Sequence, residues 1–121
     1  MARPRVVLDA NALMLPFQFR INLDAELARI LGDCDVFVPS SVLRELERVA
    51  TRDRKGKAAL ALAAKYAVRE VRGSGDRAVI AAAKDLGAHV VTNDRPLLAA
   101  LRAHGIPRIS LRSKSHLVVE A

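Results

Sequence analysis

Short buried-type runs of apolar residues alternate along this chain with longer stretches that have helical spacing. Each run is three or four residues long and rich in β-branched side chains, as in residues 6–8 (VVL) and 89–92 (HVVT). Strands that alternate with helices predict β-α-β units, in which helices cover both faces of a parallel sheet. The chain is therefore expected to have a three-layer α/β/α fold. The predicted strands are residues 6–8, 36–38, 68–71, 89–92 and 108–111, whereas residues 117–119 fit a strand or coil.

The stretches between these runs carry helix signatures. Apolar residues recur at helical spacing in residues 23–31, and Ser41 is a candidate N-cap for the helix that follows it. Gly87 and Gly105 follow the last two predicted helices and are typical helix stops. The polar segment 52–57 (RDRKGK) is the expected exposed loop. The remaining predicted helices are residues 58–67, 77–86 and 97–103.

The length and composition limit the domain count and the cellular compartment. A chain of 121 residues is expected to form one domain, spanning residues 1–121. No apolar run approaches the about 20 residues that cross a bilayer, and no secretory leader is recognisable, so a cytoplasmic protein without membrane association is expected. Cys34 is the only cysteine, which excludes an internal disulfide.

The net charge of +7 favours a polyanionic partner such as RNA, although a solvated charged surface also explains it. The chain has three Phe, one Tyr and no Trp, so few side chains are available to stack on bases. Recognition of RNA would then depend mostly on its backbone and shape. The candidate RNA-binding residues form one basic stretch: Arg44, Arg48, Arg52, Arg54, Lys55 and Lys57. The alternative is a solvated helix face whose arginines pair with Glu45 and Glu47.

Three acidic residues stand near the expected carboxyl ends of strands, where open α/β sheets bind ligands, and the placement of a fourth depends on how its connection folds. Asp9 ends the first strand, Asp94 follows the 89–92 strand, and Glu45 lies one helical turn beyond the 36–38 strand. Asp76 opens the helix that leads into the 89–92 strand. Clustered carboxylates repel one another unless a cation lies among them, and all-oxygen ligands suit Mg²⁺ or Mn²⁺. One or two such ions are therefore the expected cofactor.

Each acid also has a purely structural interpretation. Asp76 and Asp94 are candidate helix caps, and Glu45 in a first helical turn stabilises the helix dipole. Asp9 is harder to explain in this way, because a charge at the end of a buried strand needs a partner or a ligand.

Three segments resemble the PIN-domain nuclease family. Residues 7–13 (VLDANAL) are similar to its first strand, and residues 39–46 (PSSVLREL) are similar to its Pro-x-x-Val-x-x-Glu-Leu element. Residues 76–97 are similar to its C-terminal half, with VVTNDRPL as the most specific part. The resemblance covers residues 6–111. It implies a sheet of order 3-2-1-4-5 and an acidic metal site at Asp9, Glu45, Asp76 and Asp94, steadied by Asn11 and by Thr92 or Asn93.

The resemblance also has departures and a finer subgroup match. Ala10 stands where many members have Thr or Ser, and no further acid follows within a few positions of Asp76, which predicts a weaker second metal site. Residues 14–19 (MLPFQF) resemble an archaeal subgroup related to pre-rRNA-processing nucleases. The two phenylalanines there, Phe17 and Phe19, are expected to pack in the core.

The function that the resemblance implies is metal-dependent endonucleolytic hydrolysis of RNA, leaving 5′-phosphate and 3′-hydroxyl ends, in a role such as rRNA processing. One alternative is a toxin ribonuclease that is neutralised by an antitoxin, and another is a catalytically silent RNA-binding module. The expected partners are thus RNA together with an antitoxin or a ribosome-assembly protein. The helix face with Leu60, Leu62 and Tyr66 has two interpretations, which are a homodimer contact and packing in the core.

Overall fold

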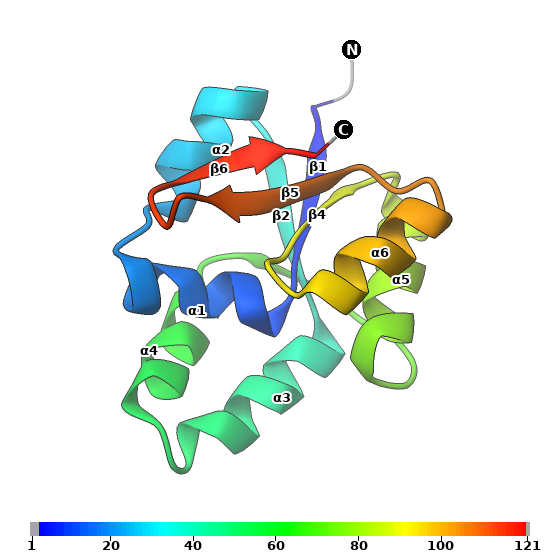
Figure 1. Cartoon of the computed structure of the whole chain (residues 1–121). Coiled ribbons are helices and arrows are strands. Elements are labelled where there is room, and N and C mark those ends of the chain that lie inside the picture. Colours follow the sequence, from blue (N-terminus) through cyan, green and yellow to red (C-terminus); the bar gives the residue numbers. More distant parts are fainter. Residues whose placement is uncertain (1–2, 121) are drawn as a thin grey trace.

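The apolar runs of the sequence assemble into one mixed sheet of order β3-β2-β1-β4-β5-β6 (Figure 1). The computed structural model describes residues 3–120. Its strands are β1 (Arg5–Leu8), β2 (Asp35–Pro39), β3 (Ala67–Arg69), β4 (His89–Val91), β5 (Arg108–Arg112) and β6 (His116–Val119). Its helices are α1 (Ala10–Phe19), α2 (Leu23–Leu31), α3 (Ser40–Ala50), α4 (Arg54–Ala63), α5 (Gly75–Leu86) and α6 (Arg95–Ala103).

The pairing of the first five strands confirms the predicted parallel arrangement. β1 lies at the centre, with Val6 beside Val36 of β2 and Val7 beside Val90 of β4. β6 is a sixth strand that the predicted order does not contain. It pairs antiparallel with β5, because the tight turn after β5 brings the chain straight back along its neighbour.

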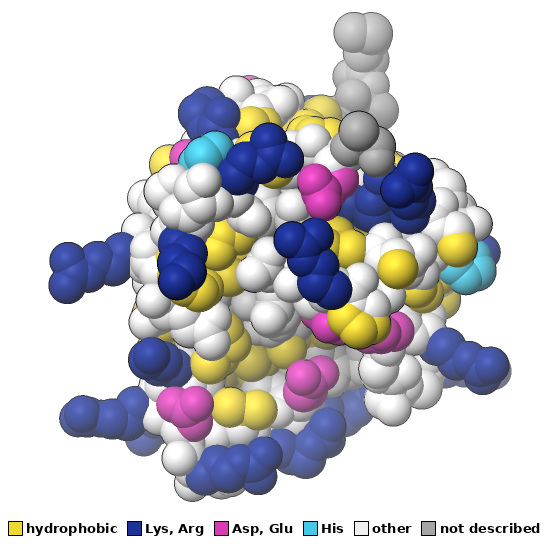
Figure 2. Space-filling view, viewed as in Figure 1, with side chains coloured by type: hydrophobic (Ala, Val, Ile, Leu, Met, Phe, Trp, Pro, Cys, Tyr) yellow, Lys and Arg dark blue, Asp and Glu magenta, His cyan; other side chains and the backbone are white. Residues whose placement is uncertain are grey.

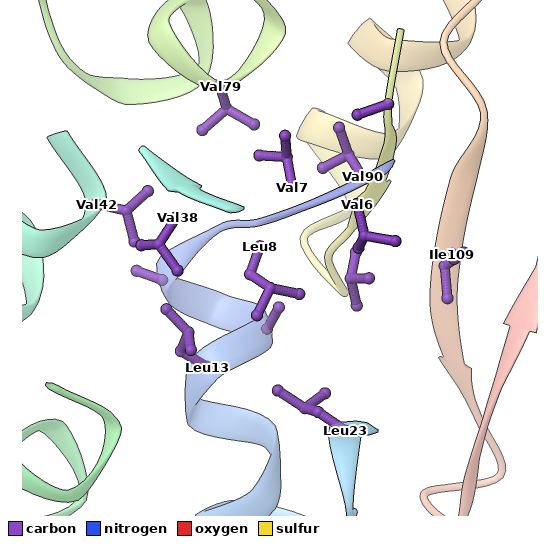
Figure 3. Close-up of a cluster of buried hydrophobic side chains, with 14 of the residues drawn as sticks. Val6, Val7, Leu8, Leu13, Leu23, Val38, Val42, Val79, Val90 and Ile109 are labelled. Atoms are coloured by element: carbon purple, nitrogen blue, oxygen red, sulfur yellow. The ribbon is translucent and has the colours of Figure 1, made fainter. Parts of the chain in front are cut away.

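Alternating side chains of β1 connect the sheet to helices on its two faces. Figure 3 shows Val7 pointing toward Val79 of α5, whereas Leu8 points toward Leu13 of α1. Val6, Val7 and Leu8 are completely buried, as expected for a central strand covered on both sides. The predicted three-layer fold class is confirmed.

Two helix starts differ from the sequence-based expectation. Ser41 is not an N-cap, because α3 already begins at Ser40 and Pro39 takes the cap position without a side-chain hydrogen bond. The predicted exposed loop 52–57 is confirmed only for Arg52 and Asp53, because α4 begins at Arg54. The Asp53 side chain caps α4 by accepting a hydrogen bond from the backbone N–H of Lys55, at 2.9 Å.

Helix α1 is a further element that the sequence pattern did not predict, and it contains Pro16. The core prediction is wrong for Phe17, which is 37% exposed, and holds in part for Phe19, which packs against the core at its edge. Leu60, Leu62 and Tyr66, the expected dimer face, also pack partly against the core. Self-association through them stays a prediction. Within residues 3–120, no helix combines the length and apolar character that crossing a membrane requires.

Candidate active site

The sheet topology brings the ends of β1 and β4 together at the point where the strand order reverses. From β1 the chain proceeds to β2 and β3 on one side, and then crosses to β4 on the other. Leu8 lies beside Val91 in the parallel register. The residues that follow these two strands, from Asp9 and from Thr92 onward, therefore leave the sheet at the same edge, in the position where open α/β sheets bind ligands.

Asp9 is the buried centre of this edge. It is the N-cap of α1, and its Oδ1 accepts a hydrogen bond from the backbone N–H of Ala12 at 2.7 Å. Burial raises the pKa of its carboxyl group from 3.8 to about 7. Hydrogen bonds from Thr92 and Ala12 oppose this shift, whereas the charges of Glu45 and Asp94 add to it. The site therefore holds a carboxylate that lacks sufficient positive charge around it.

Polar side chains from the first turn of α1 and from the residue after β4 order the segment that carries Asp94. The Oδ1 of Asn11 accepts a hydrogen bond from the backbone N–H of Asn93 at 2.7 Å. The hydroxyl of Thr92 accepts from the N–H of Asp94 at 3.1 Å and also bonds to the Asp9 carboxyl group. Asp94 occupies the N-cap position of α6 but makes no capping hydrogen bond with its side chain. Its carboxylate is thus not used as a cap.

Helix α3 contributes Glu45 and a residue that the sequence analysis did not assign to the site. Glu45 is exposed, and Ser41 lies one turn before it on the same helix. Both residues line the same cavity. The Ser41 side-chain oxygen is buried and has no hydrogen-bond partner within the described chain. The i, i+4 spacing to Glu45 is the sequence pattern that points to Ser41 as a site residue.

Asp76 approaches from the opposite wall, in the first turn of α5. It is exposed, and the cap position of that helix belongs to Ser74, which makes no side-chain capping bond. Capping therefore does not explain Asp76.

All four predicted acids line one cavity of about 530 Å³. Figure 2 shows Asp and Glu side chains on this face of the molecule, with Lys and Arg side chains along its lower edge over α3 and α4. The full lining consists of Asp9, Ala10, Asn11, Ser41, Val42, Glu45, Gly75, Asp76, Val79, Asn93, Asp94, Arg95 and Pro96.

Comparison with known proteins shows that the sequence of this chain matches a family model. Residues 6–114 match the model of the PIN like domain. This chain belongs to the PIN-like domain family. The family predicted from the sequence motifs is thereby confirmed.

Two curated relatives resemble this PIN-like chain along nearly its whole length. Ribonuclease VapC4 of Methanocaldococcus jannaschii is 31% identical, with 95% of each chain covered. Ribonuclease VapC9 of Archaeoglobus fulgidus is 32% identical and covers 94% of this chain and 87% of its own length.

Among solved structures, the PIN domain endonuclease Utp24 has the same fold. Its TM-score is 0.83 at 23% identity, covering 98% of this chain and 93% of that chain. A domain of a functionally unknown protein from Methanocaldococcus jannaschii has a TM-score of 0.70 at 19% identity, covering 91% and 92% of the two chains.

The donor chemistry of this PIN-like cavity fits a hard divalent cation. Carboxylates, a side-chain amide and a hydroxyl provide oxygen ligands, which suit Mg²⁺ or Mn²⁺. The raised pKa of Asp9 and the unpartnered Ser41 hydroxyl are both features that a cation with its bound water would relieve. Among residues 3–120, no three Asp, Glu, His or Cys side chains lie close enough together, as they are placed, to hold a metal ion. Because Glu45 and Asp76 are exposed, their side chains have the freedom to rotate onto an ion.

The predicted basic stretch divides into parts with different surroundings. The guanidinium of Arg44 donates to the backbone carbonyl of Gly73 at 3.0 Å. Arg52 lies beyond the end of α3, so the predicted stripe does not continue along that helix. In the described chain, neither Glu45 nor Glu47 forms an ion pair with these arginines, so the pairing expected in the solvated-face alternative is absent. Arg48, Arg54, Lys55 and Lys57 are exposed on α3 and α4.

Proposed function

We propose that this protein is a metal-dependent endoribonuclease that hydrolyses RNA phosphodiester bonds in the acidic cavity between α3, α5 and the ends of β1 and β4. The observation that carries this proposal is the convergence of Asp9, Glu45, Asp76 and Asp94 on one cavity from four separate parts of the chain. The names of the two curated relatives support the ribonuclease activity.

Each acid has a proposed role that follows from its surroundings. Asp9 and Asp94 are the direct ligands of a Mg²⁺ or Mn²⁺ ion, because they leave neighbouring strands at the same edge and their charges interact. Glu45 and Asp76 complete the coordination or hold water from the two walls. When bound, the ion supplies an activated water and compensates charge on the phosphate.

The remaining polar residues hold these carboxylates in place. Asn11 and Thr92 bond to the backbone N–H groups of Asn93 and Asp94, so the Asp94 segment is fixed before an ion binds. Ser41 presents a free hydroxyl at the α3 wall. The exposed cations Arg48, Arg54, Lys55 and Lys57 of α3 and α4 are proposed to hold backbone phosphates of the RNA.

An RNA cleavage assay with Mn²⁺ tests this proposal directly. The wild-type protein should cut a labelled RNA only when Mn²⁺ is present, and Asp94→Asn should lose at least a hundredfold in rate. The matched control is Asp33→Asn, which removes an exposed carboxylate outside the cavity and should cut like the wild type. Equal cleavage by Asp94→Asn would assign the activity to other residues or a contaminant. Wild-type RNA binding without cleavage would favour the silent RNA-binding module.

Two cellular roles are compatible with this activity, namely RNA processing and action as a toxin with a cognate antitoxin. The two VapC relatives, matched over nearly their full length, make both roles worth testing. A toxin should arrest growth when expressed alone, and a small reading frame beside its gene should restore growth. Ribosomal genes in that position, with no growth arrest, would favour rRNA processing.

A further inference from the structure

Helix α3 presents two pairs of residues at i, i+4 spacing, and each pair faces a different part of the molecule. Ser41 and Glu45 line the acidic cavity. Ser40 and Arg44, each one position earlier, instead bond to the segment between β3 and α5. The two pairs lie on neighbouring faces of α3, so this helix connects the cavity wall to that segment.

The contacts of the second pair are specific hydrogen bonds. The backbone N–H of Val71 donates to the Ser40 hydroxyl at 3.0 Å, and the guanidinium of Arg44 donates to the carbonyl of Gly73 at 3.0 Å. Ser40 is buried and Arg44 is exposed. Together they bind both ends of residues 71–73, close before Asp76.

Few other contacts within the described chain hold segment 71–73 in place. In the described chain, residues 70–74 take part in no backbone-to-backbone hydrogen bond outside helices and strands. Residues 72–77 are exposed, so the core does not hold them. Gly73 and Gly75 have positive φ values of 76° and 66°, so the backbone turns sharply at both residues. Packing against the core does not enforce these turns.

We propose that Ser40 and Arg44 are positioning residues for Asp76. They fasten segment 71–73 to α3 and thereby set the distance between Asp76 on one wall and Glu45 on the other. This role rests on the proposed function, because it concerns the geometry of the proposed metal site. It also replaces the prediction that Arg44 binds RNA phosphates, since its guanidinium is used within the protein.

The test compares Mn²⁺ binding by calorimetry, without RNA, in the wild type, Arg44→Gln and Arg48→Gln. Arg48 is exposed one turn further along α3 and forms no ion pair in residues 3–120, so its variant removes the same charge without releasing the segment. Loss of a positive charge alone should strengthen cation binding. A positioning role predicts the opposite effect on Mn²⁺ affinity. Arg44→Gln should bind Mn²⁺ about tenfold more weakly than the wild type, as for other residues that orient metal ligands.

Ser40→Ala provides a second variant that changes no charge. It should weaken Mn²⁺ binding in the same direction, and amide exchange should become faster in residues 71–76 of both variants, already in metal-free protein. Thermal unfolding of each variant checks that the fold is retained.

Three results would overturn the role. Mn²⁺ binding by Arg44→Gln that is as tight as binding by Arg48→Gln, with unchanged amide exchange, would remove the positioning role and leave the proposed function intact. A drop of about 0.7 in the salt slope of single-stranded RNA binding by Arg44→Gln, with unchanged Mn²⁺ affinity, would assign Arg44 to a phosphate. Absence of Mn²⁺ binding in the wild type would remove the proposed function and this role together.

Discussion

At the scale of single residues, Asp9 is a buried acid that is surrounded by protein and not by water. It caps a helix and accepts a hydrogen bond from Thr92, yet burial still raises its pKa to about 7. The loss of water around this carboxyl group outweighs the hydrogen bonds from Thr92 and Ala12, and the charges of Glu45 and Asp94 add to its effect. A buried acid with a strongly raised pKa lowers the stability of the fold, and such acids are typical of functional sites.

The raised pKa of Asp9 predicts how stability depends on pH in metal-free protein. Because the folded pKa lies above the unfolded value, the folded state binds more protons, so stability should fall as pH rises from about 4 to about 7. Asp9→Asn keeps the cap without the charge and should remove this fall. At pH 8 the variant should be more stable than the wild type by on the order of 3–4 kcal/mol.

Urea unfolding in EDTA, measured at several pH values between 4 and 8, checks this prediction. The difference in the free energy of unfolding between Asp9→Asn and the wild type should grow through that window. A difference that stays constant with pH would show that Asp9 titrates normally in the folded protein.

At the scale of elements, α3 and α4 cross closely because Gly56 has no side chain. A Cβ at this position would collide with the Cγ1 atom of Val49 and press on the α3 backbone. Gly56 is buried within α4, where helix propensity alone would favour alanine. Close helix packing thus explains why a glycine stands inside a helix.

Gly56→Ala is therefore expected to destabilise the protein. Overpacking costs about 1–3 kcal/mol, and the gain in helix propensity of about 1 kcal/mol offsets only part of it. The net loss should be up to about 2 kcal/mol by urea unfolding with an unchanged m-value. Lys57→Ala, the exposed neighbour, is the control and should differ from the wild type by less than about 0.5 kcal/mol. A more stable Gly56→Ala protein would contradict the packing account.

Most strands could be predicted from the sequence, whereas the start of α4 could not. The strands β1, β2, β4 and β5 were predictable because buried parallel strands read as β-branched runs. The start of α4 was not, because Asp53 and Gly56 read as loop residues until their contacts with Lys55 and Val49 are known. Strand β6 stayed ambiguous because it is a short edge strand with Val119 exposed.

At the scale of the whole molecule, a chain of net charge +7 surrounds an acidic cavity with basic residues. Asp9, Asp94 and Glu45 were identifiable from their positions near strand ends, because parallel strands end at one edge of a sheet. Asp76 opens a helix, and only the family resemblance assigned it to the site. Ser41 and the contacts of Arg44 were not, since one depends on where α3 begins and the other on the path of segment 71–73. Motif positions thus identified the carboxylates, and only the packed structure identified what holds them.

The most direct test of the central claim is the effect of Mn²⁺ on the free energy of unfolding. If the acids share an ion, the wild type should gain about 2.7 kcal/mol at a free Mn²⁺ concentration of 100 times its dissociation constant. Asp33→Asn should gain as much, and Asp94→Asn should gain little at that concentration. An unchanged stability of the wild type at every Mn²⁺ concentration, or an equal gain in Asp94→Asn, would contradict a metal site built on these carboxylates.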